Sequence, residues 1–329
     1  MTMHVGSREM ARAQLALHQA LGSCLYDRTR KINLIDLAQY EEDGQKHDRL
    51  ALRFHVDYRI PETQLEALGR EPLQNLSFVG FPSMVTESKP RLQQWYGPRR
   101  WYRSQGWGRT SSNPHTSRAD PLRGGVSVST DFSGSGTLGG IVRDRATGNE
   151  MLLSNWHVLV VYWGARRGQR IRQPGRDDGG TYADVIANLE RDAMSADLDA
   201  AVAVLNDRRD IINQQLSVGP VRGVRRAQLG MDVEKSGRSS RRTSGRVTGI
   251  NGAAIMPYSG IERVIRNVVT IEQLNLGEVS RGGDSGSWWL DSATKEAVGL
   301  HFAGQNNPEL GLAMDMQSVL DALNVDIFM

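Results

Sequence analysis

The chain has a single cysteine, Cys24, among its 329 residues. An internal disulfide needs two cysteines and a thiol-rich metal site needs several, so the sequence excludes both. Long apolar runs are also missing, because no stretch approaches the roughly 18 apolar residues that a membrane span requires. The N-terminal segment MTMHVGSREMARAQLALHQALG carries charges through an amphipathic helix pattern and lacks the apolar core of a signal peptide. We therefore expect a cytoplasmic protein without a membrane partner.

Lysine is scarce, and arginine carries nearly all of the positive charge. Lys and Arg together number 40, and only positions 31, 46, 89, 235 and 295 are Lys. Arginine clusters at residues 97–109, 164–172 and 237–246 have the composition of a polyanion-binding surface. However, 37 acidic residues nearly balance the basic ones, and no nucleic-acid-binding motif accompanies the clusters. We interpret them as solvated loops and do not expect nucleic acid as a partner.

The length suits two domains of roughly 100–200 residues each. Residues 1–88 predict a small α/β accessory domain, with a helix over 7–28 and strands in RLALRFHVDYRIP (49–61) and LSFVGFPSMV (76–85). Residues 89–119 are rich in Pro, Gly, Ser and Arg with interspersed aromatics, which is typical of a linker or a surface arm.

The pattern of residues 120–329 predicts many short strands separated by glycine-rich turns, which indicates a sandwich or a barrel. The strand-like runs are GTLGGIVRD, MLLSNWHVLVV, DAAVAVL, GMDVEKSG, GRVTGING, VIRNVVTIE, SWWL, AVGLHFAG and GLAMDM. The last run, DMQSVLDALNVDI, has apolar residues at helical spacing and predicts a C-terminal helix that covers the barrel.

The motif SRGGDSGSWW raises the question of whether Ser285 is a nucleophile. A hydroxyl needs a base to take its proton, and the base needs an anion to fix its tautomer. His157, at the end of the apolar run in LLSNWHVLV, is the candidate base. Asp199 directly precedes the strand AAVAVL, where a buried carboxylate needs a partner such as an imidazole N–H. Asp197 is the alternative, and we prefer Asp199 because it adjoins the strand.

Glycines on both sides of Ser285 allow a sharp backbone turn. Gly283 precedes it by two residues and Gly286 follows it. The N–H groups of Gly283 and Ser285 can then converge on a developing oxyanion. We therefore predict an oxyanion hole made of Gly283 and Ser285.

The motifs LSNWHV, DAAVAVL, GDSGS and VGLHFAG together resemble those of the trypsin/chymotrypsin-like serine protease family. The resemblance covers about residues 120–329 and is closer to the disulfide-free bacterial type, including HtrA-like proteins, and to the plant narrow-leaf type trypsin-like proteins. It implies a mainly β catalytic domain of two six-stranded Greek-key β-barrels (chymotrypsin-like) with a C-terminal helix. It assigns His157 as general base and acid, Asp199 as orienting anion and Ser285 as nucleophile, with no metal or other cofactor. RLALRFHVDYRIPETQLE also resembles a domain that precedes such catalytic domains in bacterial proteins.

The resemblance extends to the primary specificity pocket. Trypsin has an aspartate six residues before its serine, and Val279 stands there in this chain, so cleavage after Lys or Arg is not expected. VGLHFAG resembles the strand of glutamate-specific bacterial and viral 3C-type proteases in which a histidine, here His301, binds Glu or Gln. Ser280 and Arg281 are expected to add donors, and Gly304 to pair with the backbone of an extended substrate. A buried His301 held by a backbone carbonyl is the alternative.

Two positions depart from the family pattern. Phe302 stands where many relatives have a serine that supports the catalytic aspartate, which leaves the support of Asp199 open. In secreted relatives a newly cut N-terminus pairs with the aspartate before the serine, here Asp284. We expect Asp284 to find an internal partner, with Arg as a candidate, or the site to be assembled by a partner or an oligomer.

These observations predict an intracellular serine endopeptidase that acts on protein or peptide substrates through an acyl-enzyme, with Glu or Gln favoured before the cleaved bond. The N-terminal domain is expected to serve regulation, assembly as a homo-oligomer or substrate docking. The alternative is a catalytically idle trypsin-like fold that binds nucleic acid or an acidic protein as a regulatory module.

Overall fold

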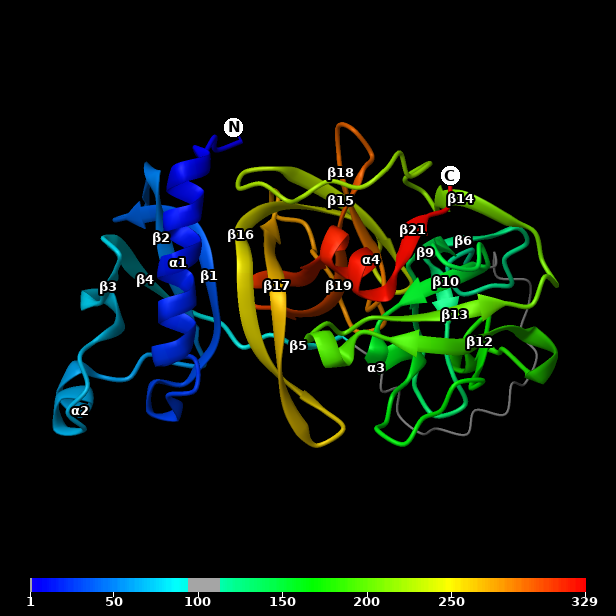
Figure 1. Cartoon of the computed structure of the whole chain (residues 1–329), viewed down its shortest axis with the longest axis horizontal. Coiled ribbons are helices and arrows are strands. Elements are labelled where there is room, and N and C mark those ends of the chain that lie inside the picture. The colour runs from blue at the N-terminus through cyan, green and yellow to red at the C-terminus, as the bar shows by residue number, and fades with distance from the viewer. Residues whose placement is uncertain (1, 94–112) are drawn as a thin grey trace.

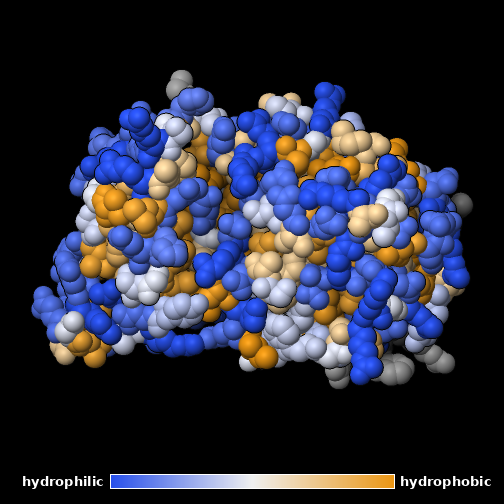
Figure 2. Space-filling model, viewed as in Figure 1, coloured by the Kyte–Doolittle hydropathy of each residue, from blue (hydrophilic) through white to orange (hydrophobic). Residues whose placement is uncertain are grey.

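The computed structural model describes residues 2–93 and 113–329, and Figure 1 shows these as three adjoining parts. The predicted linker or surface arm (89–119) therefore lies largely outside the described residues, as does the arginine cluster at 97–109. Within the described ranges, no helix is both long enough and apolar enough to cross a membrane. On the face drawn in Figure 2, hydrophilic residues cover most of the surface, and hydrophobic residues show between them in small groups.

The N-terminal part is a helix packed on a small sheet. Its elements are α1 (Ser7–Cys24), β1 (Ile32–Glu42), β2 (Gln45–Val56), α2 (Glu62–Ala67), β3 (Ser77–Phe78) and β4 (Phe81–Glu87). Helix α1 buries one face, on which Ala13, Ala16, Leu17 and Ala20 recur at helical spacing. Strand β1 was not predicted from the sequence. It is buried along most of its length and lies between two neighbouring strands, so it does not show the alternation of a half-buried strand.

The N-terminal sheet continues into the second of two barrels. Strand β1 pairs antiparallel with β16 (Arg241–Tyr258), with Leu34 opposite Ala254. At this junction Arg53 binds Asp36 of its own part through two hydrogen bonds of 3.0 and 2.8 Å, and it reaches across to Glu272 of the barrel through one of 2.8 Å. The two parts thus share both a sheet and a buried polar cluster.

The second barrel, in the middle of Figure 1, is closed. Its strands are β15 (Asp232–Gly237), β16, β17 (Ile261–Gln273), β18 (Trp288–Asp291), β19 (Ala297–Asn306) and β20 (Glu309–Asp315). They pair in the order β15-β16-β17-β20-β19-β18, and β18 returns to β15. This confirms the predicted strands in GMDVEKSG, GRVTGING, VIRNVVTIE, SWWL, AVGLHFAG and GLAMDM.

The first barrel has the same order of strands. Its elements are β7 (Val126–Val128), β8 (Gly136–Leu138), β9 (Gly140–Asp144), β10 (Glu150–Ser154), β11 (Arg170–Arg172), β12 (Val185–Asp192) and β13 (Ala201–Leu205). Strands β8 and β9 form one bent strand that turns at Gly139, where a Cβ would lie 2.2 Å from the indole nitrogen of Trp288. The order is β7-β8/β9-β10-β13-β12-β11, and a bridge between Ser129 and Arg172 closes the ring. The two six-stranded barrels predicted from the resemblance are confirmed.

The C-terminal helix is also confirmed. Helix α4 (Met316–Leu323) packs through its apolar face on β19 and β20, and β21 (Val325–Ile327) then pairs with β9 of the first barrel. The remaining elements are α3 (Trp156–Leu159), β5 (Arg91–Leu92), β6 (Leu122–Gly124), β14 (Ile211–Gln215) and 3-10 turns at Arg28–Arg30, Leu73–Asn75, Arg176–Asp178, Tyr182–Asp184 and Met194–Ala196.

Candidate active site

His157 and Asp199 form a buried pair on the first barrel. His157 lies in α3, directly after β10, and Asp199 lies two residues before β13. The His157 Nδ1 and Asp199 Oδ2 atoms are 2.5 Å apart, and the His157 backbone N–H donates to the other carboxylate oxygen at 3.0 Å. Because a carboxylate only accepts, this contact places a proton on Nδ1 and directs Nε2 away from Asp199. Asp197 lies apart from the pair and binds Arg263 and Arg266.

Tyr258 supports Asp199 in place of the hydroxyl that Phe302 cannot supply. Its phenol donates to Asp199 Oδ2 at 2.9 Å, and the Asn155 side chain donates to the Asp199 backbone carbonyl at 2.7 Å. Burial and then the nearby carboxylate raise the pKa of Tyr258 well above its usual value, so the phenol remains a neutral donor. Tyr258 ends β16 and carries no sequence signal for this role, since no local motif links it to a residue 59 positions away.

Ser285 belongs to the second barrel and lies in residues 283–286, which we call the serine turn and which pack against the first barrel. Gly283 and Gly286 have positive φ values of 101° and 96°, and a Cβ on Gly286 would lie 2.2 Å from the Thr137 carbonyl oxygen. Thr137 N–H in turn donates to the Ser285 carbonyl at 2.8 Å, which ties the serine turn to the first barrel. The Ser285 hydroxyl donates to the Phe302 carbonyl at 3.2 Å. Among the hydrogen bonds of the described residues, none joins Ser285 Oγ to His157.

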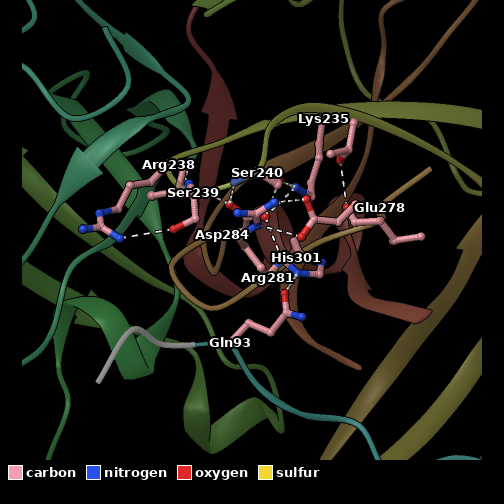
Figure 3. Close-up of polar contacts among 12 residues, drawn as sticks. Gln93, Lys235, Arg238, Ser239, Ser240, Glu278, Arg281, Asp284 and His301 are labelled. Carbon is pink, nitrogen blue, oxygen red and sulfur yellow. Dashed lines mark hydrogen bonds and ion pairs between the residues drawn. The ribbon is translucent and has the colours of Figure 1, made fainter. Parts of the chain in front are cut away.

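Asp284 has an internal partner, Lys235, rather than the expected arginine (Figure 3). The ammonium lies 2.9 Å from Oδ2, and the backbone N–H groups of Ser239 and Ser240 donate to Oδ1 at 2.9 and 3.0 Å. Burial by itself would raise the pKa of Asp284, but the Lys235 charge and hydrogen bonds from Ser240 and Arg281 hold it at about 2. The residue before the serine is therefore already paired as a carboxylate, without a new N-terminus.

Residues 91–93, which we call the docked segment, lie against the serine turn. Strand β5 pairs antiparallel with β19, with Leu92 opposite Ala303 and Arg91 opposite Gly304. The Gln93 N–H donates to the Phe302 carbonyl at 3.2 Å, the same oxygen that accepts from Ser285 Oγ. The Gly283 N–H donates to the Gln93 carbonyl oxygen at 2.5 Å. Ser285 N–H, the other predicted oxyanion donor, has no partner among the described residues.

The side chain of Gln93 points to His301 (Figure 3). Its Oε1 lies 2.7 Å from His301 Nε2, and the Trp289 indole N–H donates to His301 Nδ1 at 3.3 Å. An indole N–H only donates, so Nδ1 is the acceptor and the proton resides on Nε2. Burial, and then the charge of Lys235, lowers the pKa of His301 to about 3. His301 is thus a neutral imidazole whose remaining N–H is directed at a side-chain carbonyl.

The decisive observation is that both barrels share one strand order and that the serine turn of the second packs against the first, at the end of the strand that precedes His157. The protein has the fold of the trypsin-like serine proteases. His157 lies in α3, Asp199 lies two residues before β13 and Ser285 lies in the serine turn. These are the places expected from the motifs LSNWHV, DAAVAVL and GDSGS.

Solved structures with a similar arrangement include three proteases. Nocardiopsis protease is 15% identical, with 64% of this chain and 100% of that chain covered and a TM-score of 0.48. Cellulomonas bogoriensis chymotrypsin is 16% identical, with 63% and 98% covered and a TM-score of 0.46. A glutamic acid specific serine protease, described as using a novel histidine triad in substrate binding, is 19% identical, with 63% and 100% covered and a TM-score of 0.46. No family model and no curated protein matches the chain.

The other predicted substrate-binding residues of this trypsin-like fold divide into two groups. Gly304 pairs with Arg91, and a Cβ on Gly304 would lie 2.5 Å from Gln93 Nε2 and 2.9 Å from Ser280 Oγ. The Ser280 hydroxyl is buried without a hydrogen-bond partner among the described residues and faces the same small space. Arg281 differs, because its guanidinium binds Glu278 at 2.6 Å and only its backbone N–H reaches the site, at Asp284.

Proposed function

We propose that the chain is a serine endopeptidase that cleaves the peptide bond after glutamine. The proposal depends on one observation: a glutamine lies against the serine turn with its main-chain carbonyl on Gly283 N–H and its side-chain carbonyl on His301. A substrate needs both contacts. The contact with Gly283 N–H polarises the carbonyl that reacts, and the contact with His301 selects the side chain of the residue to which that carbonyl belongs.

The acylation step uses three groups of this chain. Rotation about the Ser285 Cα–Cβ bond frees Oγ from the Phe302 carbonyl, and His157 Nε2 takes its proton as Oγ bonds to the substrate carbonyl carbon. The resulting oxyanion accepts from Gly283 N–H and Ser285 N–H, each such donor being worth about 10²–10³ in rate. The C–N bond then breaks as His157 passes the proton to the departing amine.

Deacylation repeats the same chemistry with water. His157 removes a proton from water, whose oxygen bonds to the acyl carbon of the ester on Ser285. The ester C–O bond breaks, the proton returns to Ser285 Oγ and the product leaves with a new carboxylate. Throughout, Asp199 holds the imidazole in one tautomer and stabilises its cation, and Tyr258 holds the carboxylate in place.

The selectivity for glutamine follows from the charge state of His301. A neutral N–H suits an amide carbonyl, whereas a buried glutamate carboxylate would bring an unpaired charge into the site at considerable cost. A Lys or Arg side chain presents only donors to the His301 N–H, and the buried side chain of Val279 offers no counter-charge. Glutamine is therefore the preferred residue, and protonated glutamic acid is the next best fit.

The test uses the full-length variant Gln93→Pro, which has neither the N–H that binds Phe302 nor the carboxamide that fills the His301 site. Peptides that end in Gln, Glu, Ala or Lys before a fluorogenic amide are compared. We expect cleavage of the Gln peptide with at least a 10-fold preference over Glu at pH 7. The same variant carrying Ser285→Ala is the control and should be inactive. Equal hydrolysis of the Gln peptide by both proteins would overturn the proposal.

A further inference from the structure

The docked segment has the contacts of a bound substrate, and it belongs to the same chain. Its strand pairs with β19, its last carbonyl lies on the Gly283 N–H, and its last side chain lies on His301. Because a carbonyl held at an oxyanion donor is the atom group that a nucleophile attacks, we infer that the peptide bond formed by the Gln93 carbonyl is a self-cleavage site of Ser285. This inference rests on the proposed function and adds a specific substrate to it.

The chain holds this substrate in place from the upstream side. Asn33 donates through its side chain to the Ser88 carbonyl at 2.6 Å, and Ser88 Oγ lies 2.9 Å from His55 Nδ1. One residue later, the Lys89 N–H donates to Gln305 Oε1 at 2.5 Å, next to the end of the β19 pairing. Ser88 is thus held by the N-terminal part, and it precedes the docked segment by only a few residues. Tethering of this kind converts a bimolecular reaction into a unimolecular one, so cleavage should occur within one chain.

The Ser285 hydroxyl is already near the bond to be cut. It and the Gln93 N–H donate to one oxygen, the Phe302 carbonyl, so the serine side chain and the glutamine backbone meet at a single acceptor. In the reaction Oγ bonds to the Gln93 carbonyl carbon, the bond from that carbon to the next nitrogen breaks, and the Oγ proton passes through His157 to the released amine. One water then hydrolyses the ester, which leaves a carboxylate on Gln93 and restores Ser285.

Cleavage would open the site rather than build it. In this chain Asp284 is already bound to Lys235, so it does not need a new N-terminus as its partner. Gln93, by contrast, fills the His301 site and occupies the Gly283 donor until its bond is cut and the segment departs. The uncut chain is accordingly a blocked enzyme, and cutting converts it into one that accepts substrates from solution.

The two products should remain together. Strand β1 pairs with β16, Thr270 binds Asp36 and Arg53 binds Glu272 across the junction, so the fragment before the cut shares a sheet and a buried polar cluster with the barrels. We therefore expect the fragments 1–93 and 94–329 to elute as one species under native conditions and to separate only after denaturation.

The test is the mass of the purified full-length chain over time, measured after denaturation. Wild type should yield fragments 1–93 and 94–329 at a rate that does not change on 100-fold dilution, and Ser285→Ala should stay intact. Gln93→Ala should cut at least about 100-fold more slowly, because the side-chain acceptor of His301 is lost. Gln64→Ala, the same substitution at an exposed helical position, is the matched control and should cut at the wild-type rate.

The outcomes separate this inference from the proposed function. An intact wild type together with an active Gln93→Pro variant would overturn self-cleavage and leave the endopeptidase standing. If wild type stays intact and Gln93→Pro neither cleaves Gln peptides nor reacts with a fluorophosphonate probe, the endopeptidase itself is wrong. A cut at another bond, or a rate proportional to concentration, would also overturn cleavage of Gln93 within its own chain.

Discussion

Lys235 and Asp284 form an ion pair in which both side chains are fully buried, with 2.9 Å between Nζ and Oδ2. The pair lies directly beneath the serine turn, because Asp284 precedes Ser285 and also accepts from the Arg281 N–H. A permanent lysine at this position fixes the backbone that carries Gly283 and Ser285. The serine turn is thereby shaped by the chain itself.

Replacing Lys235 with Met should strongly destabilise the protein. The substitution leaves Asp284 buried without its cation, and breaking a buried pair in this way costs about 3–5 kcal/mol. The free energy of unfolding is measured by urea denaturation in a Ser285→Ala background, so that cleavage does not interfere. Lys46→Met, at an exposed position, is the matched control and should change stability by no more than about 0.5 kcal/mol. Equal stability of the two variants would mean that Asp284 does not depend on Lys235.

Replacing Tyr258 with Phe tests its support of Asp199. The loss of a hydrogen bond to a charged group should slow peptide cleavage by the Gln93→Pro enzyme about 10-fold, corresponding to roughly 1.4 kcal/mol. An unchanged rate in Tyr258→Phe would contradict this support of Asp199. Tyr26→Phe, at an exposed tyrosine, is the control and should leave the rate unchanged.

His301→Ala should abolish selectivity without removing the nucleophile. In the Gln93→Pro enzyme, kcat/KM for the Gln peptide should fall at least about 100-fold. The carboxamide oxygen of the peptide would lose the His301 N–H, which is the donor that Gln93 uses in the wild-type chain. Labelling of Ser285 by a fluorophosphonate should stay within about threefold, since the probe does not need the glutamine site. His18→Ala, an exposed histidine of α1, provides the comparison. Parallel loss of labelling and cleavage would show that His301 holds the serine turn rather than the substrate.

The preference for Gln over Glu should weaken as the pH falls. The pKa of His301 is lowered to about 3, so the imidazole stays neutral between pH 5 and 8. A substrate glutamate has an ordinary pKa near about 4.3 and becomes increasingly protonated toward pH 5, which makes it a neutral acceptor like glutamine. The ratio of kcat/KM for Gln and Glu peptides should therefore decrease from pH 7 to pH 5. A constant ratio would mean that the charge of the substrate glutamate does not decide the preference, and would contradict the assignment of His301 as a neutral donor.

Much of the fold followed from local sequence patterns. All six strands of the second barrel, the strands in GTLGGIVRD, MLLSNWHVLVV and DAAVAVL of the first barrel, and the C-terminal helix were predicted, because alternating or helical spacing and glycine turns act over a few residues. Strands β7, β11 and β12 of the first barrel were not predicted. Strand β1 was missed, since burial between two neighbours removes the alternation that identifies a strand. His157, Asp199 and Ser285 were selected by similar local signals, since each lies beside a strand end or a glycine turn, and their catalytic role stays a prediction.

The sequence by itself determined which groups are available: a serine between glycines, a histidine at a strand end, an aspartate before a strand and a histidine in VGLHFAG. Only the tertiary structure decided what they contact. Tyr258 reaches Asp199, Lys235 reaches Asp284, and Gln93 reaches His301 across 208 positions of the chain. Such partners have no fixed spacing, because barrel closure and the path of the docked segment bring them together, and neither is encoded in a local pattern.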